Sequence, residues 1–161
     1  MAEVVADAGP LIAFGRIDRL DLLPHVFGTV LVPDVVAREC VADPLKPGAR
    51  AIDAALRSGL LSRVPDPEAS ERAFAVLDAG ESAVIGLALQ RAAVALIDEK
   101  LGRRVAAHLG VAVIGSAGVL LAAKQRGLVE AVGPILDALA ANGYRFSAEL
   151  MRAVLARAGE A

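Results

Sequence analysis

Residues 93–124, AVALIDEKLGRRVAAHLGVAVIGSAGVLLAAK, decide the fold of this chain. The stretch opens with a short apolar run, favourable for a buried strand, which stops at Asp98. A helical pattern follows, and a second apolar run, VAVI at residues 111–114, lies between two glycines as a buried strand often does. A second helical pattern completes the stretch. This order of strand, helix, strand and helix predicts parallel strands joined by helical crossovers.

The same stretch has a membrane interpretation. Residues 105–123 carry no charge, are flanked by Arg104 and Lys124, and are long enough to cross a bilayer. The glycines on either side of VAVI divide this run into pieces, and each piece has a helix or strand pattern of its own. We therefore predict no membrane span.

The alternation of strands and helices extends through the rest of the chain. An apolar run at residues 4–6 stops at Asp7 as the later run stops at Asp98, so two predicted strands end in a carboxylate. The other predicted strands are 27–32 and 60–64, and the predicted helices are 11–23 with a break near Gly15, one that opens at Pro33, 49–57, 69–77, 81–91, one that ends at Leu109, 117–126, and two that begin near Val132 and Ala148. We expect one α/β domain over residues 1–161, with a mostly parallel sheet covered on both faces.

Composition limits the kinds of site that this domain can hold. Hydrophobic residues make up 56% of the 161 residues and aromatic residues 3%, so the core must consist of small aliphatic side chains. The net charge of −2 gives no global attraction for nucleic acid, which leaves only local contacts. A single cysteine, Cys40, and two histidines exclude an internal disulfide, a thiolate zinc cluster and a histidine metal site. With no secretion signal at the start, we expect a cytoplasmic protein.

Carboxylates from separate segments are the candidate functional residues. In parallel sheets, ligands bind beyond the carboxyl ends of the strands, which is where Asp7 and Asp98 fall. Together with Glu39 and Glu81, these acids offer oxygen ligands for one or two hard cations such as Mg²⁺ or Mn²⁺. A cation held in this way lowers the pKa of a bound water and stabilises charge on a phosphodiester during hydrolysis.

Each acid also has an ordinary structural explanation. Asp7 can cap the helix that follows it, and Glu39 can be an exposed helix residue that pairs with Arg38. Asp78 and Glu81 have the spacing of a capping box at a helix start.

The residues near Asp98 leave similar alternatives. Asp98 and Glu99 can be first-turn acids of the next helix, and Ser116 can cap the helix after VAVI instead of lining a site. Three basic residues are candidate phosphate contacts, although exposed charges commonly have no such role: Arg103, Arg104 and Lys124.

Five segments together resemble the PIN-domain family, in the branch related to VapC-type toxins. They are VVADAGPLIAFGRIDRLDLL (4–23), VLVPDVVAREC (30–40), LDAGESAVIGLALQ (77–90), ALIDEKLGRRVAAHLGVAVIGSAGVLLAAK (95–124) and NGYRFSAELMRAVL (142–155). The resemblance implies an α/β/α sandwich and a site where four acids bind Mg²⁺ or Mn²⁺ and hydrolyse RNA. Those acids fall on Asp7, Glu39, Glu81 and Asp98, with Glu99 as a further ligand and Ser116 lining the site. Many relatives have Asp where this chain has Glu81, which allows a shifted metal position.

The resemblance implies a metal-dependent endoribonuclease that acts as the toxin of a toxin–antitoxin pair. An antitoxin and a second copy of the chain are then expected partners, and Leu20, Leu22 and Leu23 are candidate docking residues for an antitoxin. The alternative is a non-catalytic PIN-like module that binds nucleic acid or regulates a partner. Receiver-like and phosphatase domains also place Asp at strand ends, but the first strand here is followed by neither an acid pair nor an Asp-x-Asp motif.

Overall fold

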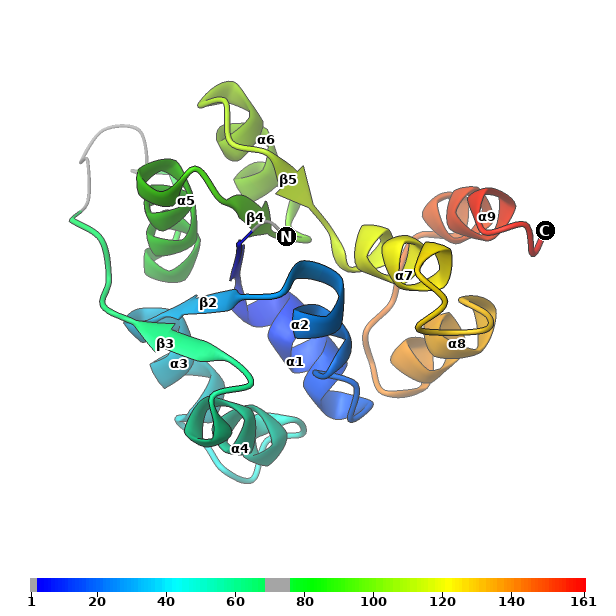
Figure 1. The fold of residues 1–161 in the computed structure, drawn as a ribbon, viewed down its shortest axis with the longest axis horizontal. Helices are drawn as coiled ribbons and strands as arrows, with labels where there is room; N and C mark the ends of the chain where they lie inside the picture. The colour runs from blue at the N-terminus through cyan, green and yellow to red at the C-terminus, as the bar shows by residue number, and fades with distance from the viewer. Residues whose placement is uncertain (1–2, 69–75) are drawn as a thin grey trace.

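The computed structural model describes residues 3–68 and 76–161 and has a parallel sheet at its centre (Figure 1). The strands of this sheet are β1 (Val4–Ala6), β2 (Val30–Pro33), β3 (Ser62–Val64), β4 (Val94–Leu96) and β5 (Val113–Ile114). They lie in the order β3-β2-β1-β4-β5, and every neighbouring pair is parallel. The predicted parallel sheet and α/β/α sandwich are confirmed.

Helices surround the sheet. They are α1 (Ala8–Arg16), α2 (Leu22–Phe27), α3 (Asp34–Val41), α4 (Ala49–Ser58), α5 (Ala79–Arg91), α6 (Lys100–His108), α7 (Ser116–Gln125), α8 (Gly133–Ala141) and α9 (Ala148–Arg157). Helix α5 packs across β1, β2 and β4 and against α3. Helices α7, α8 and α9 gather at one end of the molecule, where α7 contacts α2 and α8 contacts α1 (Figure 1).

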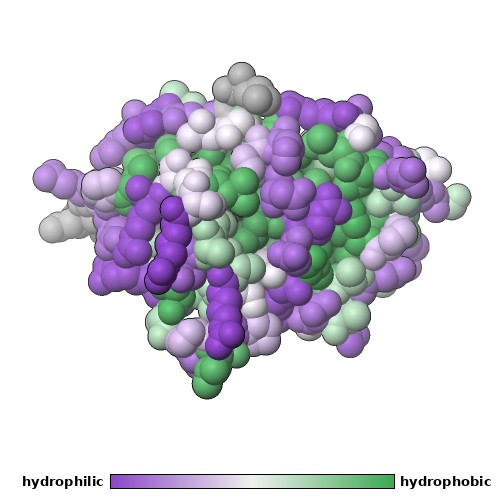
Figure 2. Space-filling view, turned by 60° about the horizontal axis from the view of Figure 1, so that its bottom comes forward, coloured by the Kyte–Doolittle hydropathy of each residue, from purple (hydrophilic) through white to green (hydrophobic). Residues whose placement is uncertain are grey.

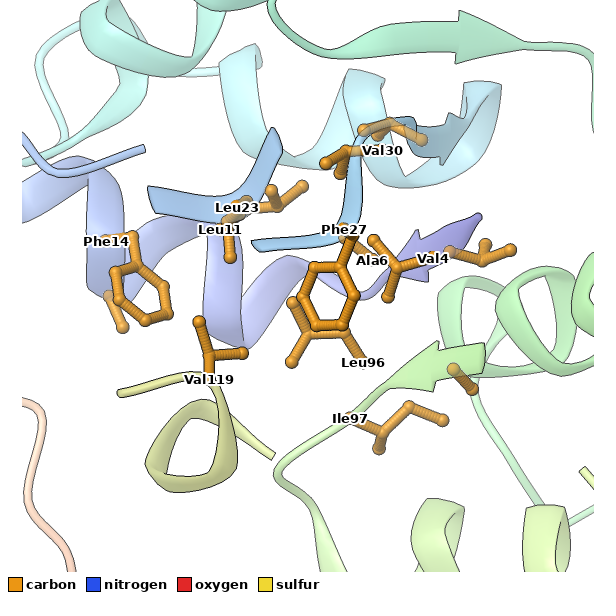
Figure 3. Close-up of a cluster of buried hydrophobic side chains, with 14 of the residues drawn as sticks. Val4, Ala6, Leu11, Phe14, Leu23, Phe27, Val30, Leu96, Ile97 and Val119 are labelled. Atoms are coloured by element: carbon orange, nitrogen blue, oxygen red, sulfur yellow. The ribbon is translucent and has the colours of Figure 1, made fainter. Parts of the chain in front are cut away.

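The central strand explains the core. Val4, Val5 and Ala6 are all fully buried, because β1 has a strand on each side and helices above and below. Phe14 of α1, Phe27 of α2 and Val119 of α7 belong to the same buried cluster as the residues of this strand (Figure 3). Apolar residues also reach the surface, and Figure 2 shows hydrophobic patches between hydrophilic side chains on one face.

The segment after β1 agrees with its prediction in one respect and differs from it in two. Helix α1 ends at Arg16, directly after Gly15, and α2 begins at Leu22, so the predicted break near Gly15 is confirmed. Gly15 also lets α4 approach closely, because a Cβ there would lie 3.2 Å from the Gly48 carbonyl oxygen. Phe27 ends helix α2 and is not part of a strand. The candidate docking residues Leu20, Leu22 and Leu23 are buried in the core, so their assignment to an exposed docking face was wrong.

The uncharged run at residues 105–123 forms the end of α6, strand β5 and the start of α7, as predicted. In the described part of the chain, no helix is both long and apolar enough to cross a membrane. Most of the predicted helix at 69–77 lies outside the described residues, and Val76 and Leu77 form a turn before α5.

Candidate functional site

Asp7 and Asp98 follow two neighbouring strands at the same edge of the sheet. Strands β1 and β4 pair in parallel with Ala6 opposite Leu96, and the Asp7 backbone N–H donates to the Leu96 carbonyl over 3.0 Å. The predicted placement of these two acids is therefore observed.

Asp7 is a helix cap and a buried acid at once. Its Oδ1 accepts a hydrogen bond from the Ala8 N–H over 2.9 Å, and the residue is only 9% exposed. Burial raises the pKa of Asp7 to about 7, the Ala8 hydrogen bond opposes this rise, and the negative charges of Glu81, Asp78 and Glu39 add to it.

Glu81 lies in the first turn of α5, and the capping alternative for this region is correct. The Asp78 carboxylate accepts from the Glu81 N–H over 2.8 Å, and the Glu81 carboxylate accepts from the Asp78 backbone, which completes a capping box. The pKa of Glu81 is raised, chiefly by burial and then by the charge of Asp78. The nearby Glu99 carboxylate raises the pKa of Glu81 further.

Glu39 is an exposed residue near the end of α3 that faces the start of α5. Its Oε2 lies 3.4 Å from the position that a Cβ on Gly80 would take, so this glycine lets α3 and α5 approach each other. Arg38, the partner considered from the sequence, pairs with Asp34 at 3.0 Å. Glu39 thus contributes charge to the group around Asp7.

Asp98 is held by three donors from two segments. The Ser116 N–H donates to Oδ1 over 2.7 Å, while the Ser116 hydroxyl donates to Oδ2 over 2.5 Å and the Tyr144 hydroxyl donates to the same oxygen. Gly115 permits this approach, because a Cβ there would lie 2.9 Å from Asp98 Oδ1 and 2.8 Å from Arg103 Nη1. Burial and the Asp98 charge raise the pKa of Tyr144, so its hydroxyl stays protonated.

The cap assignments near Asp98 divide between two residues. Glu99 is the cap of α6, where it accepts from the Gly102 N–H over 2.8 Å, and hydrogen bonds from the Gly102 and Leu101 backbones lower its pKa. Ser116 is not a cap, because it is the first residue of α7 and its hydroxyl is turned to Asp98. Asp98 itself lies ahead of α6 and interacts with the start of α7 instead.

Three of the candidate acids line a cleft of about 850 Å³ whose other charged residues are basic, whereas Glu39 and Glu81 are not part of this lining. Asp7, Asp98 and Glu99 contribute the acidic part of the lining. The basic part comes from the start of α6, from the connection between α8 and α9, and from the end of α9: Lys100, Arg103, Arg145 and Arg157. Such a lining can accept a phosphate backbone while its acids hold a cation.

The predicted basic contacts are only partly brought together. Arg103 lines the cleft and donates to the Ile97 carbonyl over 2.9 Å at the end of β4. Arg104 is exposed outside the cleft lining. The Lys124 ammonium donates to the Ala158 carbonyl and to Glu160, at 2.7 and 2.8 Å, which directs it to the C-terminal segment.

Sequence reasoning missed Tyr144, Arg145 and Arg157 because all three follow the last predicted strand. One signal was available, since Tyr144 is the only tyrosine of the chain and stands beside Arg145 in NGYRFS.

The candidate ligands have the chemistry that a hard divalent cation requires, but their side chains do not converge on one point in this structure. All candidate ligands are carboxylates, and the raised pKa of buried Asp7 among like charges is the condition that a cation relieves. However, across residues 3–68 and 76–161 no three Asp, Glu, His or Cys side chains converge on one point suited to a metal ion. The hydrogen bonds that Asp98 accepts from Ser116 and Tyr144, and the one that Glu81 accepts from the Asp78 backbone, engage these carboxylates with protein donors.

Comparison with known protein families identifies one match. The family model DUF3368, described as a PIN domain, matches residues 3–160, which is nearly the whole chain. No curated protein matches this sequence significantly.

Proposed function

The chain belongs to the PIN-domain family, whose members are generally nucleases, and we propose from this premise that it is a metal-dependent endoribonuclease. One observation carries the proposal: Asp7 and Asp98 follow neighbouring strands and line a cleft that also contains Glu99 and four basic residues. A cation site at the base and phosphate contacts around it are the two parts that phosphodiester hydrolysis requires.

The proposed ligands are the carboxylates of Asp7, Glu39, Glu81 and Asp98, with Glu99 beside them. Mg²⁺ or Mn²⁺ bound there would activate a water and stabilise negative charge on the scissile phosphate. The four residues lie on four separate segments of the chain, so the fold and not the local sequence would set the spacing of their carboxylates.

Other residues of the cleft would bind the RNA backbone or hold the acids in position. Arg103, fixed on the Ile97 carbonyl, places a positive charge beside the acids, where a phosphate of the RNA backbone would lie. Ser116 fixes the orientation of Asp98 through its N–H and its hydroxyl. Arg145 and Arg157 add two positive charges to the lining of the same cleft, which supports contact with more than one phosphate.

Cleavage of RNA by purified protein with Mg²⁺ or Mn²⁺ tests the proposal, and EDTA should abolish it. Asp7→Asn should lose nearly all activity. Asp53→Asn, the same chemical change at an acid that pairs with Arg57 on the surface of α4, is the matched control and should cut like wild type. If neither metal supports cutting, or if Asp7→Asn cuts as fast as wild type, the assignment is wrong.

As part of the same proposal, the protein acts as a toxin in the cytoplasm and is restrained by an antitoxin, with a homodimer as its assembly. The PIN-domain family membership supports this role. Induced expression in a bacterial host should arrest growth for wild type and Asp53→Asn but not for Asp7→Asn. Equal growth of all three strains at equal protein levels would count against a toxin.

A second candidate is a non-catalytic module that binds nucleic acid. The observation that favours it is the engagement of Asp98 and Glu81 with protein donors, which leaves no three ligands converged within the described residues. Calorimetric titration with Mn²⁺ separates the candidates: binding that Asp98→Asn abolishes favours the nuclease, and no binding at millimolar Mn²⁺ favours the module.

A further inference from the structure

The Tyr144 side chain, like that of Ser116, donates a hydrogen bond directly to Asp98, an acid of the proposed site. Tyr144 lies in the connection between α8 and α9, and its hydroxyl crosses the cleft to Asp98 Oδ2. The same hydroxyl lies near the first turn of α1, 3.9 Å from the position that a Cβ on Gly9 would take. Tyr144 therefore stands between the two strand-end acids.

The hydrogen bonds of Asp98 limit what it can offer to a cation. A carboxylate has about four lone-pair sites, two on each oxygen. Oδ2 accepts from both the Ser116 and Tyr144 hydroxyls, so both of its sites are filled, while Oδ1 accepts from the Ser116 N–H. Ser116 is part of α7 and is fully buried, whereas Tyr144 is half-buried in an irregular connection. Of the two hydroxyl donors, Tyr144 is the one that can leave without disturbing a helix.

We propose that the Tyr144 hydroxyl occupies the position on Asp98 that a divalent cation takes, so that metal binding displaces Tyr144. The inference rests on the proposed metal site and deepens it. It also gives a physical reason why the acids do not converge in this structure: the phenol donor stabilises the Asp98 charge in place of a cation.

Displacement of Tyr144 would reach the phosphate-binding part of the cleft. Arg145 and Phe146 follow Tyr144 directly and line the same cleft, and the Tyr144 and Phe146 rings meet edge to face with centroids 5.5 Å apart. A movement of Tyr144 therefore moves Arg145 with it. Metal loading and the position of this positive charge are coupled through one short segment, and Tyr144 is a positioning residue in that coupling.

Tyrosine fluorescence can monitor the contact between Tyr144 and Asp98, because the chain contains one tyrosine and no tryptophan. A phenol hydrogen-bonded to a carboxylate fluoresces weakly, since the excited state loses its proton to the acceptor. Titration of the full-length protein with Mg²⁺, which is not a paramagnetic quencher, should raise the tyrosine emission in parallel with binding measured by calorimetry. Asp98→Asn should emit more strongly without metal and show no Mg²⁺-dependent change, while Asp53→Asn should respond like wild type.

Tyr144→Phe tests the competition itself. This variant loses only the hydroxyl and keeps the edge-to-face contact that holds the connection in place. Because a hydrogen bond to a charged group must no longer be broken, its Mg²⁺ dissociation constant should fall about tenfold. An unchanged or weaker Mg²⁺ affinity in Tyr144→Phe would overturn the inference, as would wild-type emission that stays constant while calorimetry shows binding. Absence of any metal binding would overturn both this inference and the proposed nuclease.

Discussion

Asp7→Asn should make the protein less sensitive to rising pH. Asp7 is buried, and burial among like charges raises its pKa to about 7 from an ordinary value of 3.8. The folded state therefore keeps a proton that the unfolded state has already released over this range. Between these two pKa values the folded protein binds more protons than the unfolded chain, so stability falls as pH rises and becomes constant above pH 7.

The size of the effect follows from the interval in pH. Between pH 5 and pH 7, Asp7 is protonated in the folded protein and ionised in the unfolded chain. Each of these two pH units costs about 1.4 kcal/mol, so the free energy of unfolding of the wild type falls by about 3 kcal/mol. Asparagine keeps the oxygen that accepts from Ala8 but does not ionise. Its buried amide N–H groups can cost about 1–3 kcal/mol, but this cost is the same at both pH values.

The measurement therefore compares how much the stability of each protein, wild type and Asp7→Asn, changes with pH. Urea unfolding of wild type and Asp7→Asn at pH 5 and pH 8, in EDTA, gives four free energies of unfolding. The free energy of unfolding of Asp7→Asn minus that of wild type should increase by about 3 kcal/mol between pH 5 and pH 8. Because Glu81 and the other titrating groups are present in both proteins, they cancel to first order. A difference that stays constant across this range would refute the argument that burial holds the proton on Asp7.

Two further predictions concern charges away from the acids. Arg157→Gln should weaken RNA binding and reduce the salt slope of log affinity by about 1, whereas Arg104→Gln outside the cleft lining should change neither in a filter-binding titration. Glu160 accepts a hydrogen bond from the Lys124 ammonium and another from the Val132 N–H at the start of α8, and these two contacts lower the pKa of Glu160 to about 2. Its stabilisation is therefore present above pH 4.5 and lost as pH falls toward 2, and Glu160→Gln should lower Tm at pH 7 but not at pH 2 in a thermal melt.

The sheet could be predicted from the sequence because its strands are short, apolar and clearly punctuated. Runs that stop at Asp7 and Asp98 became neighbouring strands β1 and β4, and VAVI between two glycines became β5. Boundaries were less accurate: the apolar pattern assigned Phe27 to a strand, although it packs against the core from the end of α2. Packing against the rest of the fold decided its conformation, and local pattern does not contain that information.

The cleft could be predicted only in part. Strand ends meet at one sheet edge by topology, so Asp7 and Asp98 were accessible to sequence reasoning. Tyr144 lies 46 residues from Asp98, and the direction of Lys124 depends on a C-terminal segment that folds back on α7. Such contacts depend on how α7, α8 and α9 are arranged in space, and the apolar periodicity of the sequence does not specify that arrangement.

The choice between cap and ligand, open at the sequence level, is not exclusive. Asp7 and Glu99 each cap a helix, Glu81 completes a capping box, and all three still gather at the same sheet edge. Helix N-termini stabilise anions, so the caps allow several acids to share the edge without a cation. Burial and the number of backbone donors explain why the pKa values of two of these acids shift in opposite directions. Glu99 is exposed and accepts from two backbone N–H groups, and its pKa is lowered, whereas Asp7 is buried and accepts from one, and its pKa is raised to about 7. A cation that enters the cleft should therefore displace a proton from Asp7 before it alters Glu99.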